Sequence, residues 1–507
     1  MIVKLKAVTA LLCLGFIGVG LLVVLIDKKY RIEIDGRWNN ETRTFRVLTC
    51  LFVGATILAG TLPMGFSPIW NGEIPEWRNQ YEELAESMAE GHIDLNDPVD
   101  PKLLEMDNPY DFNARVNQGV SVAWDHAFYN GHYYMYFGIV PVLLLFLPYR
   151  LITGSALTTF HATQFFSVLL ILGIFSFFML LIRVFIKKLP FCLYILLSVF
   201  ASILSISIAI SSPALYCTAI ISAVCFAVWS LYFFMRAAYE SETGKQKLLF
   251  LFIGGLFGAL EFGCRPPIGL SNIIAIPLFI ECLKDRKTTK PAVTFFTAIP
   301  YIAVAAGLMY YNQVRFDSVF EFGQSYQMTV TDQTHLGDNI SVISSLKTIL
   351  YSIYYYFLKI DIGSILNINE IGLFFSCPVL WILIAAPLKK IFQASEAKQA
   401  GVLFKTMLLA LVIIIVIDNM WSPYPIVRYR LDICWLLGIM TFLAAGFYYK
   451  VADNKKQCIS VIGLLTLLST YFTILLIAFP HEQNFTSWYM RDIKKVLYWP
   501  IHLITQK

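Results

Sequence analysis

Two blocks between residues 108 and 138 carry the side chains best suited to chemistry: NPYD at Asn108–Asp111 and WDHAFYNGHYYMYFG at Trp124–Gly138. Asp111 and Asp125 are isolated carboxylates that can take a proton from an attacking hydroxyl group as general bases. The aromatic rings around them offer faces for stacking a sugar ring and phenol groups for hydrogen-bonding it, although a tyrosine-rich belt at the membrane interface is the alternative. The rings selected for sugar stacking are Trp124, Tyr129, Tyr133 and Tyr134.

A cation suited to binding phosphate follows in GALEFGCRPPIGL, where Arg265 is expected at an outer turn between two hydrophobic spans. A guanidinium group holds a phosphate through two parallel hydrogen bonds, and charged residues at membrane depth are functional candidates. The alternative is structural, because Glu261 lies four residues earlier on the same predicted helix and can pair with Arg265.

Two more arginines, Arg428 and Arg430, occur in PYPIVRYRLD at the expected outer start of another span. They are further candidates for binding a lipid phosphate. Snorkelling of a long basic side chain to the interface is the alternative. Asp418 and Asp432 flank this segment, and the sequence leaves open whether they simply neutralise the arginines.

Histidines and cysteines predict no metal site. The seven histidines are dispersed along the chain, and His126 beside Asp125, with His132 six residues on, is the only grouping. The ten cysteines lie in or at the ends of hydrophobic segments without a C-x-x-C pair, which favours a packing role. The chain also contains no Walker loop, no H-E-x-x-H and no dinucleotide-binding glycine fingerprint.

The elements that position these residues are mostly membrane helices. Hydrophobic residues make up 57% of the chain and charged residues 14%, a balance that a soluble globular protein rarely has. We therefore expect an all-α polytopic membrane protein of about 12 transmembrane helices, each about 20 mostly apolar residues long. The expected spans are 7–26, 46–63, 163–186, 190–210, 214–235, 248–264, 267–284, 293–311, 371–388, 404–420, 432–449 and 458–479.

Basic residues predict the orientation, because Lys and Arg in short loops resist translocation. Six lie between the first two spans: Lys28, Lys29, Arg31, Arg37, Arg43 and Arg46. Every second loop after them is also basic, so these loops are expected in the cytoplasm and the long first loop and both termini outside. The net charge of +5 then reflects topology and is no sign of nucleic-acid binding.

The expected domains follow from the spans. They are helices one and two at 1–63, an extracytoplasmic loop at 64–162, helices three to eight at 163–311, a second outer loop at 312–370, helices nine to twelve at 371–479 and an outer tail at 480–507.

Two apolar segments in the outer loops are expected to lie along the membrane interface. Tyr136–Gly154 contains two prolines and an arginine, and a span there would reverse the sides of the later basic loops. Tyr351–Phe357 is a run of aromatic rings, which prefer the headgroup level. A thirteenth span is the alternative for the second segment.

The acidic first half of the long loop predicts one amphipathic helix. Asn79 can cap it and Gly91 can end it. One apolar side is expected, formed by Tyr81, Leu84, Ala85 and Met88. The glutamates on the other side are expected to be exposed.

This outer loop resembles that of bacterial membrane glycosyltransferases of the GT-C superfamily, in particular uncharacterised family 39-like members with the NPYD and WDHA blocks. The resemblance rests on the Y-x-x-L-A-x-x-x-x-x-G helix, a G-x-Y-Y-x-Y-F-G-x-x-P segment and L-P-Y-R-L-x-T-G. In this sequence these are Tyr81, Leu84, Ala85 and Gly91, then Gly131, Tyr133, Tyr134, Tyr136, Phe137, Gly138 and Pro141, then Leu147 to Gly154.

The family pattern is incomplete at one place. The superfamily usually carries an acidic pair in a D-E-x-x-Y arrangement, and Trp77 and Arg78 stand at those positions here. Glu76 lies one residue away and is the third candidate for the catalytic carboxylate, after Asp125 and Asp111.

The resemblance implies an inverting transfer of a sugar from a polyprenyl-phosphate donor to an envelope glycan or lipid acceptor. The reaction is expected on the extracytoplasmic face of a bacterial plasma membrane, with membrane lipid as a further partner. No cofactor is specified by the sequence. Two alternatives remain: a non-catalytic membrane protein that binds envelope glycan or lipid, and a transporter of lipid-linked sugars.

Overall fold

The computed structural model describes residues 33–34, 43–61, 79–211, 214–285, 288–334, 342–360, 371–393, 397–421 and 425–478. Among these residues, nine helical segments are long and apolar enough to cross a membrane, which makes the chain an all-α multi-pass membrane protein. They are Arg43–Thr61, Thr159–Ile186, Phe191–Ile210, Leu215–Tyr239, Pro266–Lys284, Lys290–Phe316, Lys398–Met420, Val427–Val451 and Lys455–Ile474.

The remaining three of the twelve expected spans differ from the prediction or lie outside the described residues. The segment 7–26 is not described. Helix α10 (Gly244–Phe262) forms where 248–264 was expected, but it carries charged residues and is not among the nine. Residues 371–388 form three short helices, α15 (Leu373–Ser376), η8 (Pro378–Trp381) and α16 (Ile382–Ala385), because Pro378 interrupts the helix.

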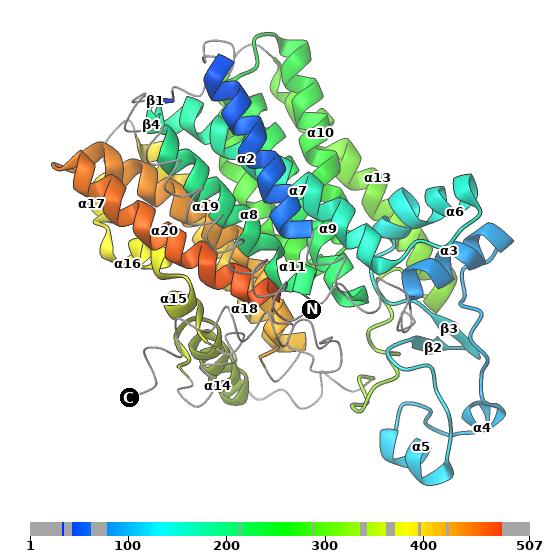
Figure 1. Ribbon diagram of the computed structural model, residues 1–507. Coiled ribbons are helices and arrows are strands. Elements are labelled where there is room, and N and C mark those ends of the chain that lie inside the picture. Colours follow the sequence, from blue (N-terminus) through cyan, green and yellow to red (C-terminus); the bar gives the residue numbers. More distant parts are fainter. Residues whose placement is uncertain are drawn as a thin grey trace, which may run out of the picture.

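The bundle is built around two helices that are buried almost throughout. They are α8 (Phe191–Ser211) and α19 (Arg430–Val451), which pack against each other. Surrounding them are α2 (Arg43–Thr61), α7 (Thr159–Leu181) with η3 (Ile182–Ile186), α9 (Leu215–Tyr239), α18 (Lys398–Trp421) and α20 (Lys455–Ala478). Figure 1 shows α10 and α13 (Lys290–Phe316) standing on the side of α9 away from α20.

One span is broken into pieces. Residues Pro266–Lys284 form α11 (Pro266–Gly269), the 3₁₀ turn η4 (Leu270–Ala275) and α12 (Ile276–Lys284). Prolines at the first turns of α11 and α12 fit helix starts, where no amide hydrogen is needed. Arg265 lies between the end of α10 and the start of α11, so it occupies the junction of these two helices.

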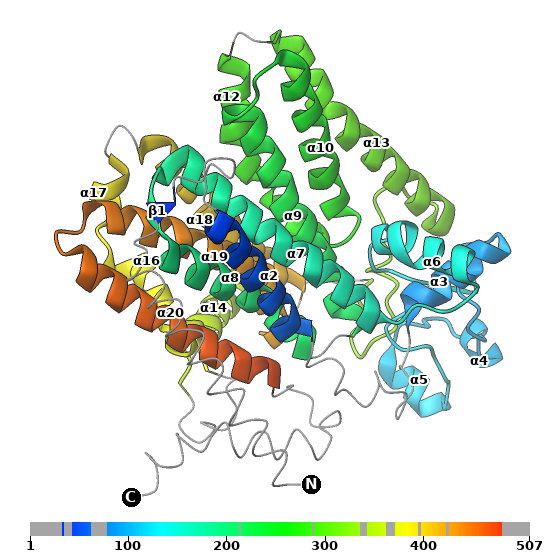
Figure 2. The same ribbon diagram turned by 45° about the horizontal axis from the view of Figure 1, so that its top comes forward.

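A group of short elements lies beside the ends of α7, α9 and α13, and both views show it apart from the bundle (Figures 1 and 2). It contains α3 (Gln80–Glu90), α4 (Pro101–Leu104), α5 (Phe112–Gln118), β2 (Ala127–Tyr129), β3 (His132–Tyr134), η2 (Val142–Phe146) and α6 (Leu147–Thr153). The apolar helix Val142–Thr153 is shorter than the roughly 20 residues that a span requires.

Helix α3 confirms the expected caps. The Asn79 side chain accepts a hydrogen bond from the Glu82 amide, and Gly91 ends the helix with φ 98°. The expected exposure of its glutamates is wrong for Glu82, because this side chain is only 11% exposed, accepts a hydrogen bond from the Leu157 amide at 2.9 Å and pairs with Arg150. Glu82 therefore attaches α3 to α6 and to Leu157, just before α7.

Strands β2 and β3 form a hairpin whose turn is Asn130–Gly131, both with positive φ, as a tight two-residue turn requires. The segment Tyr326–Met328, which follows α13, lies along β2 and extends this small sheet. The Phe128 amide donates to the Tyr326 carbonyl at 2.9 Å, and the Met328 amide donates to the His126 carbonyl at 2.8 Å. Two loops far apart in sequence are thereby joined.

The opposite end of the bundle gathers basic residues that the positive-inside pattern predicts for one side. There Arg183 pairs with Glu240 and Lys247 pairs with Asp285. The short strand β1 (Glu33–Ile34) pairs with β4 (Leu189–Pro190) at the same end. Helix α17 (Leu388–Gln393) lies against the C-terminal part of α19 and adds further lysines.

Two more elements, α14 (Val342–Ile353) and the π-helix η5 (Tyr354–Leu358), contain the aromatic run predicted at the interface. Helix α14 packs against α18, and the Ser352 hydroxyl donates to Asn419 Oδ1 at 2.5 Å. This contact places α14 near the end of α18 that leads toward Arg428.

Candidate functional site

Asp125 has φ 60°, a left-handed conformation that is uncommon for residues other than glycine. Its amide donates to the Met328 carbonyl at 3.1 Å, which ties it to the second outer loop. The carboxylate accepts a hydrogen bond from Gln327 Nε2 at 2.7 Å on one oxygen and from the Tyr216 hydroxyl on the other. Two segments far apart in sequence, Gln327–Met328 and the start of α9, therefore fix the position and direction of this carboxylate.

Arg428 lies on the other side of Tyr216. Its guanidinium carbon is 4.0 Å from the centre of the Tyr216 ring and 5.7 Å from that of Tyr429, in cation–π contact with both. Within the part of the chain that the structure describes, Arg428 forms no ion pair, and it is half-buried. Asp125, Tyr216 and Arg428, called here the Asp125 cluster, thus join a carboxylate to a cation available for an anion.

Tyr136 adds a phenol group to this cluster. Burial raises its pKa well above the ordinary value, and the nearby charge of Asp125 raises the pKa further, whereas Arg428 and Arg265 oppose the rise. The hydroxyl group is therefore neutral at physiological pH and able to donate a hydrogen bond. Tyr136 therefore lies close to Asp125, Arg428 and Arg265, three of the candidates that the sequence predicted.

Arg265 is engaged by two buried aspartates. Its Nε and Nη2 donate to the two oxygens of Asp432 at 2.8 and 2.7 Å, and Nη2 donates to Asp418 at 3.3 Å. The predicted alternative partner Glu261 is wrong, because its carboxylate accepts from Ser271 and Asn272 instead. Asp418 and Asp432, which the sequence offered as partners of Arg428 and Arg430, thus form ion pairs with Arg265.

Arg430 points away from the Asp125 cluster. It is 1% exposed, and its two terminal nitrogens donate to the backbone carbonyls of Ile371 and Tyr355 at 3.1 and 3.0 Å. These bonds hold the start of α19 to η5 and to the residues before α15. The structure thus gives Arg430 a positioning role, unlike its neighbour Arg428.

The two other candidate carboxylates differ from Asp125. Asp111 is the N-cap of α5, where its Oδ1 accepts from the amides of Asn113 and Ala114 at 2.9 and 3.1 Å. This cap accounts for the carboxylate without a catalytic role. Glu76, with Trp77 and Arg78, lies outside the described residues.

The four predicted stacking rings have unequal access. Tyr133 is fully buried against Phe128 and cannot receive a sugar, so this part of the prediction is wrong. The Tyr129 ring packs against the Tyr326 ring at 36° with 4.6 Å between centroids, while Tyr134 and Phe316 pack edge to face. Trp124, Tyr129 and Tyr134 remain partly exposed.

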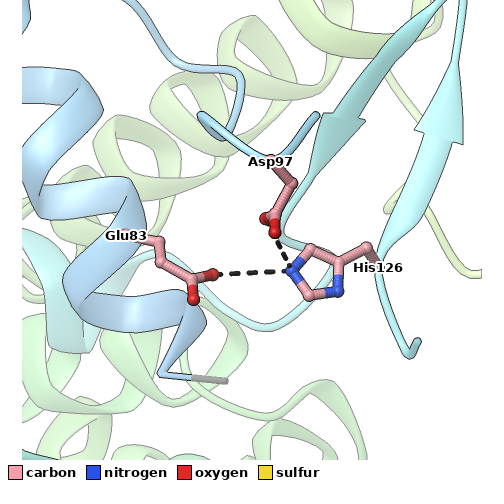
Figure 3. Close-up of side chains that lie close together, drawn as sticks. All are labelled: Glu83, Asp97 and His126. Carbon is pink, nitrogen blue, oxygen red and sulfur yellow. Dashed lines mark hydrogen bonds and ion pairs between the residues drawn. The ribbon is translucent and has the colours of Figure 1, made fainter. Parts of the chain in front are cut away.

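His126, which the sequence offered only as a neighbour of Asp125, meets two carboxylates. Its Nε2 lies 3.3 Å from Asp97 Oδ2 and 3.5 Å from Glu83 Oε2, and Figure 3 shows both acids converging on this one ring nitrogen. Glu83 comes from α3 and Asp97 from the loop after it. The three ligand atoms lie within 4.8 Å of one another, so one histidine and two acids form a grouping that the dispersed histidines of the sequence did not predict.

We expect the stability of metal-free protein to fall as His126 loses its proton. Hydrogen bonds and charges from Asp97 and Glu83 overcome the effect of burial and raise the pKa of His126 from 6.5 to about 9. A raised folded-state pKa contributes stability below pH about 6.5 that is lost as the pH rises through about 9, at most about 3 kcal/mol.

Thermal unfolding of EDTA-treated protein across this pH range measures the effect. The His126→Gln variant, which cannot be protonated, should show a flatter pH dependence between the same limits. Equal pH dependence in wild type and variant would contradict a charged His126.

Tyr216 and Gln327 were missed by the sequence predictions. Tyr216 lies three residues after Pro213, at the start of α9, and an isolated tyrosine at the start of a span was its only sequence signal. Gln327 carries no local signal, because its role depends on the second outer loop lying along β2.

Comparisons with known proteins assign no function to this site. No family model and no curated protein matches the chain, so the resemblance to the GT-C superfamily stays a prediction.

Proposed function

We propose that the chain is a membrane glycosyltransferase that moves a sugar from a polyprenyl-phosphate donor to an envelope glycan or lipid acceptor. The observation that carries this proposal is the Asp125 cluster, in which a fixed carboxylate and a half-buried arginine, unpaired with any acid among the described residues, flank one tyrosine. Group transfer from a phosphate needs a base for the nucleophile and a cation for the leaving group.

The reaction is a single inverting displacement. The acceptor hydroxyl oxygen attacks the anomeric carbon while Asp125 takes the hydroxyl proton. The bond from that carbon to the phosphate oxygen breaks, and its electron pair leaves with the polyprenyl phosphate. Arg428 stabilises the negative charge that develops on this phosphate.

Tyr216 and Tyr136 complete the proposed site. Tyr216 connects the carboxylate to Arg428, so the base and the phosphate site are held at a fixed separation. The neutral Tyr136 hydroxyl is a hydrogen-bond donor for a phosphate or sugar oxygen. The partly exposed rings of Trp124, Tyr129 and Tyr134 supply the faces for a sugar ring.

The proposed location is the extracytoplasmic face of a bacterial plasma membrane. The Asp125 cluster lies at the end of the bundle away from the ion pairs Arg183–Glu240 and Lys247–Asp285. Basic loops favour the cytoplasm, which supports an outward-facing site that a lipid-linked donor can reach along the membrane.

Loss of Arg428 should weaken use of the donor without unfolding the protein. We expect Arg428→Ala to lower transfer from a radiolabelled polyprenyl-phosphate sugar in proteoliposomes by about 10- to 100-fold, the equivalent of one charged hydrogen-bonded contact. Arg428→Lys should recover part of the activity as a point charge. The exposed Lys347 of α14 provides the matched control, Lys347→Ala.

Binding of the donor separates transfer from the two other functions. Wild type that binds the lipid phosphate through Arg428 but transfers no sugar would be a non-catalytic binding protein. Movement of the intact donor across the vesicle membrane would instead indicate a transporter. Unchanged binding and transfer in Arg428→Ala would contradict the phosphate site.

A further inference from the structure

A second cluster lies beside Asp125 and takes no part in the proposed displacement. We propose that Glu83, Asp97 and His126 bind one divalent metal ion of the Zn²⁺ class and that this ion fastens α3 to the start of β2. The proposal does not rest on sugar transfer, because metal binding is measurable on the protein itself.

The ligand atoms have the separations that such an ion requires. Nitrogen and oxygen ligands lie about 2.0–2.2 Å from Zn²⁺, which puts two ligands of a tetrahedron about 3.4 Å apart. His126 Nε2 is 3.3 Å from Asp97 Oδ2 and 3.5 Å from Glu83 Oε2. All three atoms lie within 4.8 Å, so only the carboxylates need to approach each other slightly.

The hydrogen bond at the other ring nitrogen orients His126 for this role. Nδ1 is 2.9 Å from the Trp124 carbonyl, which can only accept, so Nδ1 carries the hydrogen. Nε2 then presents its lone pair to the carboxylates when a metal ion takes the place of the proton. Histidine ligands typically donate their second N–H group to a carbonyl or carboxylate in this way.

The three proposed ligands differ in burial, and this difference leaves a path for the ion from solvent. The His126 side chain is 1% exposed, whereas those of Glu83 and Asp97 are 34% and 33% exposed. The imidazole and the buried Asp97 Oδ2 therefore form the floor of the site, and the exposed parts of the two acids lie toward solvent. Three protein ligands with an open fourth position for water are typical of accessible zinc sites.

The ion would act on Asp125 by positioning it. Gln80, one turn before Glu83 on α3, donates from Nε2 to the Asp125 carbonyl at 2.8 Å and contacts His126 Nδ1 at 3.3 Å. A bond from Glu83 through the metal to His126 would lock α3 against the start of β2. Asp125 would then be held by the hydrogen bond from Gln80 to its own carbonyl and by the metal bridge at the next residue, His126.

The test uses the full chain in detergent, stripped with EDTA and titrated with Zn²⁺ alone by calorimetry, with bound zinc counted by mass spectrometry. All proteins carry Cys50→Ser, because Cys50 is the exposed thiol among the described cysteines. We expect His126→Asn to lose one bound Zn²⁺ per chain or to weaken its binding by about 100-fold, at least the cost of losing an outer partner.

Glu83→Gln and Asp97→Asn should show the same loss, and they keep the proposal testable if His126→Asn misfolds. The matched control is His132→Asn on the same hairpin. His132 and His92 both contact Asp94, at 3.0 and 3.1 Å, and form the nearest competing histidine–acid group. Equal zinc binding by wild type and the three ligand variants, or loss of the ion in His132→Asn, would overturn the assignment.

Discussion

Asp125→Asn is expected to abolish sugar transfer, lowering the rate by about 10²- to 10⁴-fold, the usual contribution of a general base. The substitution preserves the size and shape of the side chain but removes its ability to take a proton. Gln327 and Tyr216 can still reach an amide, so the loop should keep its fold. The measurement is single-turnover transfer in proteoliposomes, which separates the chemical step from binding.

Asp111→Asn is the matched comparison, because asparagine and aspartate are equally good helix N-caps. The proposal requires this variant to transfer sugar at nearly the wild-type rate. Full activity of Asp125→Asn together with an inactive, folded Asp111→Asn would move the catalytic base from one carboxylate to the other.

Arg265→Ala should produce the largest loss of stability, about 3–5 kcal/mol, because it leaves buried charges without their partner. Asp418 and Asp432 are 3% and 0% exposed, and Arg265 is their common cation. The half-life of the detergent-solubilised protein at raised temperature measures the effect, since a large membrane protein seldom unfolds reversibly.

A charge-removing second substitution tests the cause. Arg265→Ala with Asp432→Asn should be more stable than Arg265→Ala alone, because one unpaired carboxylate has been neutralised. Arg428→Ala should stay close to wild type, since Arg428 forms an ion pair with no carboxylate in the described ranges. Wild-type stability of Arg265→Ala would contradict this account and would return Arg265 to the phosphate-binding candidates.

Local sequence signals predicted the membrane class and several helix boundaries. Asn79 and Gly91 identified the ends of α3 because a cap depends only on residues within a few positions of it. Apolar length likewise identified most spans. The failure at 371–388 has a local cause as well, since Pro378 breaks a segment whose overall hydrophobicity alone suggested one helix.

These local signals could not predict the contacts within the site. Asp125 is 91 residues from Tyr216 and 202 from Gln327, and Arg265 is 167 residues from Asp432. Such pairs are decided by how helices and loops meet in space. Residue type indicated Asp125 and Arg428 as candidates, but only the packing distinguishes Arg428 from Arg265 and Arg430, whose guanidinium groups have other partners.

Mass spectrometry of envelope glycans tests the central claim most directly. A strain lacking this protein is complemented with wild type or with Asp125→Asn, at equal amounts of protein in the membrane. The account predicts that one defined sugar disappears on deletion, returns with wild type and stays absent with Asp125→Asn. Glycans that are identical in all three strains would contradict sugar transfer by this protein.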